Sequence, residues 1–306
     1  MLPTRRGSFH LFRFAGIDVF LHWSWFIVAV IGINYRGRAY PSLLWNVLEY
    51  LSLFVIVLLH EFGHSLACRQ VGGKADQIIL WPLGGVAYVA PPPRPGPTLW
   101  SIAAGPLVNV VLFPLLSLLV LYAQAAGWPD DMPNAYKLLQ SVWFINTLLL
   151  AFNLLPIYPL DGGQVLRSLL WFVVGPARSL MVVAIIGFAG VAGLLVFAVW
   201  AGDLWFVVLS VFILLHCWNG LMHARSLSRI AKAPPRTGLA CPICLAVPPV
   251  GDFWRCARCR KPFDPFATQA LCPHCGAQFG VARCLECGGA RSLVEWISPP
   301  QMPPGS

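Results

Sequence analysis

Two histidines and a glutamate follow directly on one of the most apolar stretches of the chain. The apolar run is Leu53–Leu59, and the motif after it is His60-Glu-Phe-Gly-His64. Histidines four positions apart on a helix share one face, which is the spacing that holds a single metal ion, and the neighbouring glutamate reaches a water molecule on that metal. The pattern is typical of zinc hydrolases.

The surroundings of this motif restrict the fold. Phe54–Leu59 is apolar on every face, as a membrane-spanning helix is and an amphipathic surface helix is not. The motif has only three fixed letters, and a buried histidine is more often a hydrogen-bonded core residue than a ligand. Ionisable side chains at membrane depth are costly, however, and they mark functional sites. Three of them on one apolar helix favour a zinc site inside a bilayer.

The composition agrees with a membrane protein. Hydrophobic residues make up 58% of the chain and charged residues 11%, against about 25% charged in a typical soluble domain. The start of the chain has a basic flank without a cleavage site, so no removable signal peptide is expected. We predict a polytopic α-helical membrane protein with about six transmembrane helices, near residues 20–34, 43–69, 99–126, 136–171, 177–201 and 204–223.

The fourth apolar segment contains a break. Residues Asn153–Gly163 include two prolines and two glycines, which do not continue a helix. Irregular backbone at membrane depth is tolerated only where it is buried in protein or lines a wet cavity. A catalytic zinc needs three protein ligands and one open position; His60 and His64 supply two. The candidates for the third are Asp161, His216, His223 and His22.

Residues 75–90, between the second and third segments, differ from a membrane helix. Ile78–Val89 contains two short β-prone runs joined around Pro82 and Gly84-Gly85, which predicts a β-hairpin. An ordinary connecting loop is the alternative. An exposed hairpin edge can accept an unwound peptide as an added strand, so Gly84 and Gly85 are candidate substrate contacts.

The composition changes again after a polar linker at residues 224–240. Eight of the ten cysteines lie beyond it, in four Cys-x-x-Cys pairs. Each pair can supply half of a four-thiolate zinc site, so two structural zinc ions are expected. Pairing of neighbours along the chain is the simplest connectivity, and interleaved pairing stays open. The pairs are Cys241/Cys244, Cys256/Cys259, Cys272/Cys275 and Cys284/Cys287.

These features predict three parts and an orientation. The parts are a membrane domain over 1–223, the linker over 224–240 and a double zinc-ribbon-like domain over 241–297. Basic residues gather in alternate loops, which by the positive-inside rule places both termini in the cytoplasm. A reducing cytoplasm favours zinc over disulfides. The net charge of +9 thus follows largely from topology and does not require a nucleic-acid partner.

The sequence resembles the site-2 protease family of intramembrane zinc metalloproteases. The resemblance rests on the His60-Glu-Phe-Gly-His64 motif, on Asn153–Gly163 with its Leu-Asp-Gly-Gly end, on the glycine-containing hairpin and on Ala104–Asn109. The opening Gly16–Trp25 is similar to the six-span branch typified by the sporulation sigma-factor-processing protease. That branch often ends in a cytosolic CBS domain, and the cysteine pairs of this chain depart from it.

The resemblance implies roles for four residues. His60, His64 and Asp161 would bind one catalytic zinc, and Glu61 would be the general base. The implied substrates are membrane-spanning proteins, which places the chain in a cell membrane as a multi-pass protein in contact with lipid. The partner of the zinc-ribbon region is not indicated by the sequence.

Two asparagines and one alternative function complete these expectations. Asn109 or Asn153 is a candidate oxyanion donor, and polar packing between helices is the other role open to them. The alternative function is a non-catalytic membrane adaptor that binds client proteins through a groove between its spans and through its zinc ribbons. Glu61 speaks against it, because a binding-only protein needs no base beside the metal.

Overall fold

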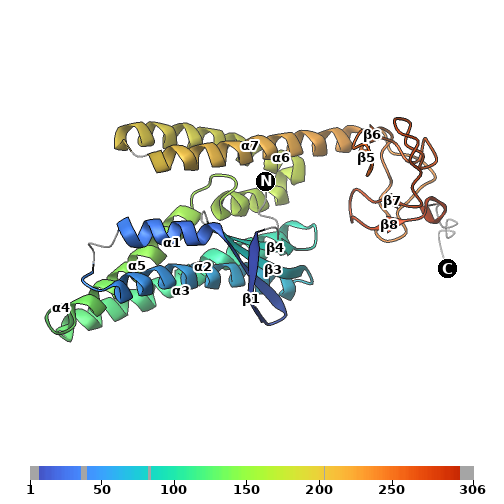
Figure 1. The fold of residues 1–306 in the computed structure, drawn as a ribbon. Coiled ribbons are helices and arrows are strands. Elements are labelled where there is room, and N and C mark those ends of the chain that lie inside the picture. The colour runs from blue at the N-terminus through green and yellow to red at the C-terminus, as the bar shows by residue number, and fades with distance from the viewer. Residues whose placement is uncertain (1–6, 36–39, 82–83, 203, 297–306) are drawn as a thin grey trace. The chain divides into compact units, whose positions relative to one another are not determined.

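A computed structural model of the chain describes residues 7–35, 40–81, 84–202 and 204–296. The chain divides into two compact units, Met1–Leu221 and Met222–Ser306. The first is a bundle of long helices with a small sheet, and the second is a loop-rich region with short strands (Figure 1). The predicted domain boundaries stay predictions. The predicted linker is helical as far as Lys232, and residue 297 lies outside the described residues.

Long apolar helices dominate the first unit. They are α1 (Ser24–Tyr35), α2 (Leu43–Gln70), α3 (Pro95–Ala125), α5 (Pro133–Asn153), α6 (Asp161–Ala201) and α7 (Leu204–Lys232), with the single turn α4 (Trp128–Asp131) before α5. Among the described residues, α2, α3, α5, α6 and α7 have the length and the apolar composition that a membrane crossing needs. The predicted polytopic helical fold is therefore confirmed.

The break expected in the fourth segment is present. Helix α5 ends at Asn153 and α6 begins at Asp161, so the intervening chain is irregular. Helix α6 also bends at Gly175, whose φ of 80° is not helical, directly before Pro176. A left-handed backbone followed by a residue without an N–H interrupts the hydrogen-bond ladder, so the two parts of α6 run in different directions.

The first expected span differs from the prediction. Residues 20–22 belong to a strand, and α1 has only 12 residues, whereas a helical crossing takes about 20. Strand β2 (Ile17–His22) pairs in parallel with β3 (Lys74–Trp81), which directly follows α2. Because α2 is about 42 Å long, its two ends lie on opposite sides of a bilayer. The expected first span over 20–34 is therefore the end of a strand followed by a short helix, and not one long helix.

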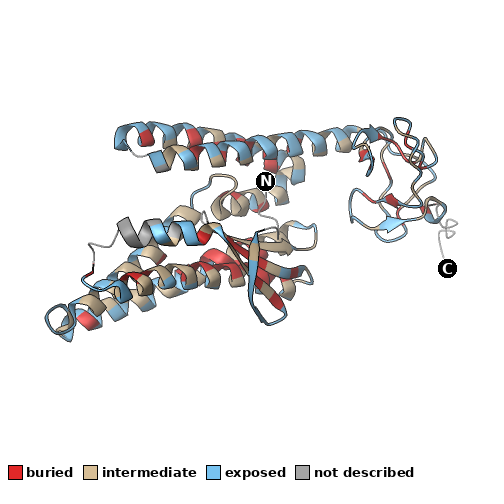
Figure 2. Cartoon of the chain, in the orientation of Figure 1, coloured by how far each residue is buried: buried red, intermediate tan, exposed pale blue. Residues whose placement is uncertain are grey.

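The sheet has four strands in the order β1-β2-β3-β4. The predicted hairpin is β3 with β4 (Gly84–Ala90), and its turn at 82–83 lies outside the described residues. The hairpin of β1 (Ser8–Phe14) with β2 was not predicted. Ile17, Val19, Ile78 and Leu80 are fully buried against α2, and Figure 2 shows buried residues concentrated where the sheet meets that helix. β4 is left as an edge of the sheet.

The second unit is built around cysteines rather than a large apolar core. Its regular elements are β5 (Trp254–Arg255), β6 (Pro262–Phe263), β7 (Ala282–Arg283), β8 (Ala290–Arg291) and the short 3₁₀ turn η1 (Leu293–Trp296). β5 pairs with β6 and β7 with β8, each as a two-stranded hairpin. Trp254 donates its indole N–H to the carbonyl of Arg283, which joins the two hairpins.

Candidate metal centre and its cavity

Three ligand atoms from two helices converge in the first unit. His60 and His64 lie one turn apart on α2, and Asp161 is the first residue of α6. The two Nε2 atoms are 3.1 Å apart, and Asp161 Oδ2 lies 2.9 Å from His60 Nε2 and 3.3 Å from His64 Nε2. Ligand atoms around a tetrahedral zinc lie about 3.3 Å from one another. The donor set and its spacing fit a zinc ion.

The second nitrogen of each histidine is held by the protein. His64 Nδ1 donates to the carbonyl of Ser101 at 2.9 Å, and a carbonyl can only accept, so Nε2 of His64 presents a lone pair. His60 Nδ1 lies 2.6 Å from Oδ1 of Asn109. When Nδ1 of His60 carries the proton in that contact, Nε2 of His60 is unprotonated and presents its lone pair to the ligand cluster. Such partners orient metal-binding imidazoles and fix their tautomers.

Asn109 is itself held by a second asparagine. Its Nδ2 donates to Oδ1 of Asn146 at 2.8 Å, and Nδ2 of Asn146 donates to the backbone carbonyl of Asn109 at 3.1 Å. Both side chains are fully buried. Asn109 thus contacts the side of the His60 ring that faces away from the ligand cluster, and it does not line the cavity beside that cluster, whereas Asn153 does. Sequence reasoning overlooked Asn146 and Ser101, although an asparagine within the apolar helix α5 is itself a signal.

This geometry makes Asn109 a positioning residue with a measurable effect. We expect Asn109→Ala to weaken zinc binding at the membrane site roughly 10–100-fold, because His60 loses the partner that fixes its tautomer. Asn109→Asp keeps the acceptor and should be milder. Competition with a chelator measures the affinity, and Thr147→Ala is the control, since the Thr147 hydroxyl donates to the carbonyl of Trp143 on its own helix and Thr147 is not part of the ligand cluster. An unchanged affinity in Asn109→Ala would contradict the assignment.

Glu61 lies beside the ligands and is tied to the sheet. It is 6% exposed, and its Oε2 accepts a hydrogen bond of 2.8 Å from the backbone N–H of Ala87 in β4. Two glycines make room for the site: a Cβ at Gly85 would overlap the Glu61 carboxyl group, and a Cβ at Gly105 would overlap the His64 ring. The site therefore depends on close backbone approach by both β4 and α3.

A cavity of about 450 Å³ opens onto these residues. Its walls come from α2, β4, the end of α5, the start of α6 and α7, and they include Gly84, Gly85 and Asn153. Of the other histidines considered as ligands, His216 lines this cavity but is not part of the ligand cluster, and His22 contacts Ser24 instead. His223 belongs to the second unit.

The eight paired cysteines form two separate groups in the second unit, each with four Sγ atoms within 4.8 Å of one another. The first pair along the chain meets the fourth, and the second meets the third, so the pairing is nested; the simplest, sequential connectivity was wrong. The inner group closes around the β5–β6 hairpin, and the outer group joins the two ends of the domain. The groups are Cys241, Cys244, Cys284 and Cys287, and Cys256, Cys259, Cys272 and Cys275.

The cysteine groups have the chemistry of metal sites. All eight thiols are free rather than disulfide-bonded. The N–H of Cys259 donates to Sγ of Cys256 at 3.4 Å, and this bond, together with those from the backbone of Arg258 and from neighbouring thiols, lowers the pKa of the Cys256 thiol to about 6. A low pKa favours the thiolate, which is the form that binds zinc.

Comparison with known proteins gives consistent matches. The chain matches the profile of peptidase family M50 over residues 49–137 and 131–197. It is 34% identical over 208 residues to "Zinc metalloprotease MJ0392" of Methanocaldococcus jannaschii, a match that covers 67% of this chain and 58% of that protein. It is 29% identical over 154 residues to "Stage IV sporulation protein FB" of Bacillus subtilis, covering 49% and 46%.

A solved structure is similar as well. It is the "Site-2 Protease from Methanocaldococcus jannaschii", with a TM-score of 0.54 and 31% sequence identity, and the match covers 70% of this chain and 95% of that one. The chain spans 58% and 46% of the lengths of the two curated relatives. The residues matched by the family profile lie within the first unit and include His60, His64 and Asp161.

Proposed function

The chain belongs to peptidase family M50, and we propose that it is an intramembrane zinc metalloendopeptidase that cleaves membrane-spanning proteins. One observation carries the proposal: His60, His64 and Asp161 point three ligand atoms at one another beside the buried carboxylate of Glu61. A binding module has no use for such a carboxylate. The cavity in front of it gives a peptide access to all four side chains.

The contacts of each side chain suggest its role in the reaction. His60, His64 and Asp161 would hold the zinc ion, which when bound supplies an electrophile and brings the pKa of a water molecule to about 7. Glu61 takes a proton from the attacking water and returns it to the leaving amine, a transfer suited to its Oε1, since Oε2 accepts from Ala87. Asn153, on the cavity wall, is our candidate donor to the developing oxyanion.

Substrate binding falls to strand β4. A helical substrate hides its carbonyls in i→i−4 hydrogen bonds and must unwind before attack. β4 ends the sheet order, and the N–H of Ala87 faces Glu61 rather than β3, so this edge offers backbone groups beside the base. We infer that the unwound segment adds to β4 as a further strand, past Gly84 and Gly85.

Ala87→Pro tests the coupling of the edge to the base. Proline removes the N–H that Glu61 accepts and places a ring in the edge strand, where the substrate would pair. We expect cleavage of a single-span reporter to fall at least about tenfold, because both substrate alignment and the Glu61 position suffer. Ala87→Gly keeps the N–H and should retain most activity. Equal activity in the two variants would refute docking along β4.

The orientation and the cysteine groups belong to the same proposal. β1 and β2 share a sheet with β3 and β4, so the N-terminal strands lie on the side of the α2–α3 connection. That connection and the strands carry Arg13, Lys74 and Arg94, and Arg69 lies in the last turn of α2 beside them, so the positive-inside rule favours the cytoplasm for this side. Four further crossings, by α3, by α5 with the first part of α6, by the rest of α6 and by α7, would return the chain to that side. The two cysteine groups would then bind structural zinc in a reducing compartment.

A further inference from the structure

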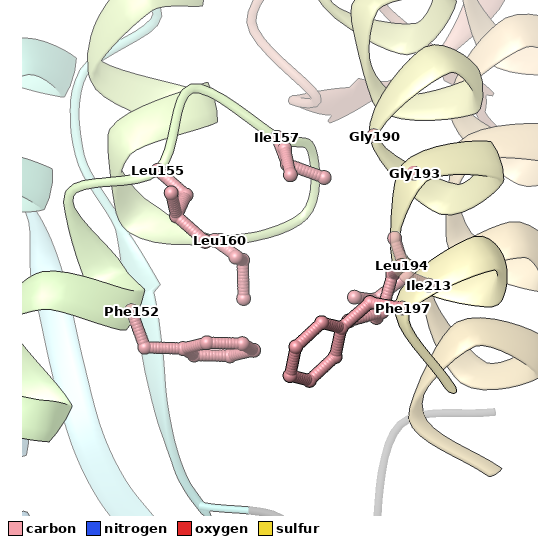
Figure 3. Close-up of a pocket in the computed structure, with 9 residues that line it drawn as sticks. All are labelled: Phe152, Leu155, Ile157, Leu160, Gly190, Gly193, Leu194, Phe197 and Ile213. Carbon is pink, nitrogen blue, oxygen red and sulfur yellow. The ribbon is translucent and has the colours of Figure 1, made fainter. Parts of the chain in front are cut away.

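A second cavity lies next to the catalytic one and is lined only by apolar residues. Its volume is about 240 Å³, and its nine lining residues come from the end of α5, from the break before α6, and from α6 and α7. Figure 3 shows Leu155, Ile157 and Leu160 of the break facing Leu194 and Phe197 of α6 across the space. We refer to it as the apolar pocket.

The apolar pocket adjoins the proposed active site. Phe152 and Leu160 line both cavities, and together they form the partition between them. Leu160 directly precedes the proposed ligand Asp161, so the pocket begins one residue from the metal centre. When the scissile bond of a peptide lies at the metal centre, the side chains that flank this bond are therefore close to the apolar pocket.

The two cavities differ in polarity, which indicates what the apolar pocket receives. The catalytic cavity is lined by Glu61, Asp161, Asn153 and both histidines, and hydrolysis requires water in it. An apolar side chain next to the scissile bond would be exposed to that water. We propose that the apolar pocket binds this side chain, a large aliphatic or aromatic residue flanking the scissile bond, and so selects the cleavage position. This inference rests on the proposed proteolytic function.

A bilayer lipid chain is the competing occupant, since lipid tails are as apolar as leucine. The position of the pocket favours the substrate. Phe152 and Leu160 in its wall also line the cavity of the metal centre, where a peptide must be held, and burial of a leucine or phenylalanine side chain away from the water of that cavity favours binding. A lipid tail gains no comparable free energy on entering the pocket, because the bilayer that it leaves is already as apolar as the pocket.

Two glycines of α6 set the depth of the apolar pocket. A Cβ at Gly190 would lie 2.5 Å from Cδ1 of Ile157, so that position is already filled by a neighbour. A Cβ at Gly193 would meet no atom within 4 Å. A larger residue at Gly193 can therefore occupy the pocket without displacing the backbone, which makes this glycine the specificity-determining position.

The test compares reporters that differ only beside the scissile bond. A single-span reporter is cleaved in proteoliposomes, the scissile bond is located by mass spectrometry, and each flanking residue is replaced in turn by Leu, Phe and Ala. Wild-type protein is compared with Gly193→Leu and with Val196→Leu, a control on the same helix whose side chain is 71% exposed and lies outside the pocket. Zinc content is measured in each, because it should not change.

We expect Gly193→Leu to cleave the Leu and Phe reporters at least about tenfold more slowly on one side of the scissile bond, and the Ala reporter within about twofold of wild type. Val196→Leu should match wild type throughout. A uniform loss on all reporters, or no change on any, would overturn the pocket's role and leave a lipid chain as its occupant. A wild type that cuts no reporter, like Glu61→Gln, would instead contradict the protease itself and the pocket's role with it.

Discussion

Glu61→Gln should abolish cleavage while the membrane zinc stays bound. Loss of a general base typically costs about 10²–10⁴-fold in rate. Glutamine keeps the size of the side chain, and its carbonyl oxygen can still accept from the N–H of Ala87, so the link to β4 survives. Glu61 is not one of the three converging ligands, so zinc affinity should change little. Loss of activity with unchanged zinc content would therefore identify Glu61 as the base, whereas loss of both would identify it as a zinc ligand.

The measurement pairs reporter cleavage with elemental analysis of the same purified protein. Glu49→Gln is the matched control, because Glu49 is a second glutamate on α2 that is nearly as buried, at 7% exposure, and does not line the cavity. Activity of Glu61→Gln within about tenfold of wild type would sink the general-base role. A wild type that binds client proteins as well as Glu61→Gln does, and cuts none, would favour the adaptor.

The ligand cluster could be predicted because its signal is a conflict between residue type and environment. His60 and His64 share a helix face, which local geometry fixes, and Asp161 lies 101 positions from His60 in a stretch that prolines and glycines must break. Each of these side chains is ionisable and lies in an apolar segment, where an apolar side chain would cost less free energy to bury in the membrane. Such conflicts are visible in a single sequence.

The unpredicted parts depend on contacts between distant segments. Strand β2 merges into the apolar residues of the expected first span, and its alternation becomes meaningful only beside β3, with which it pairs in parallel. The apolar pocket likewise contains no polar residue that would mark it in the sequence, and residues far apart in the chain, such as Gly193 of α6 and Leu160 of the break, form its walls together. Hydrophobic patterning cannot distinguish such a space from ordinary packing.

The zinc content of the full chain should be about three ions per molecule, one in the open membrane site and two in closed four-thiolate sites. A chain ending at Arg236 should hold about one. Replacing His60 and Asp161 by alanine should remove only the membrane zinc, because the cysteine groups are complete within the second unit. Elemental analysis of reduced protein gives each value.

Nested pairing makes a sharper prediction than the total. In the variant with the four outer cysteines replaced by serine, Cys241, Cys244, Cys284 and Cys287, the inner group is intact, so the zinc content should fall only from about three to about two. Sequential pairing would make the same variant lose half of each site, and the content would fall to about one. Replacement of the four inner cysteines is the reciprocal test.

Zinc removal should also show how far the second unit depends on its metal for folding. The second unit has short strands and little apolar core, so zinc binding, worth roughly 10–16 kcal/mol per structural site, must supply most of its stability. Chelation should unfold this unit and expose the buried Trp254 and Trp296, while the helices of the first unit stay folded through packing within the bilayer. Resistance of the second unit to proteolysis after complete zinc removal would contradict the structural role of zinc. Isolation of its cysteines as disulfides would contradict both the zinc sites and the cytoplasmic placement of the C-terminus.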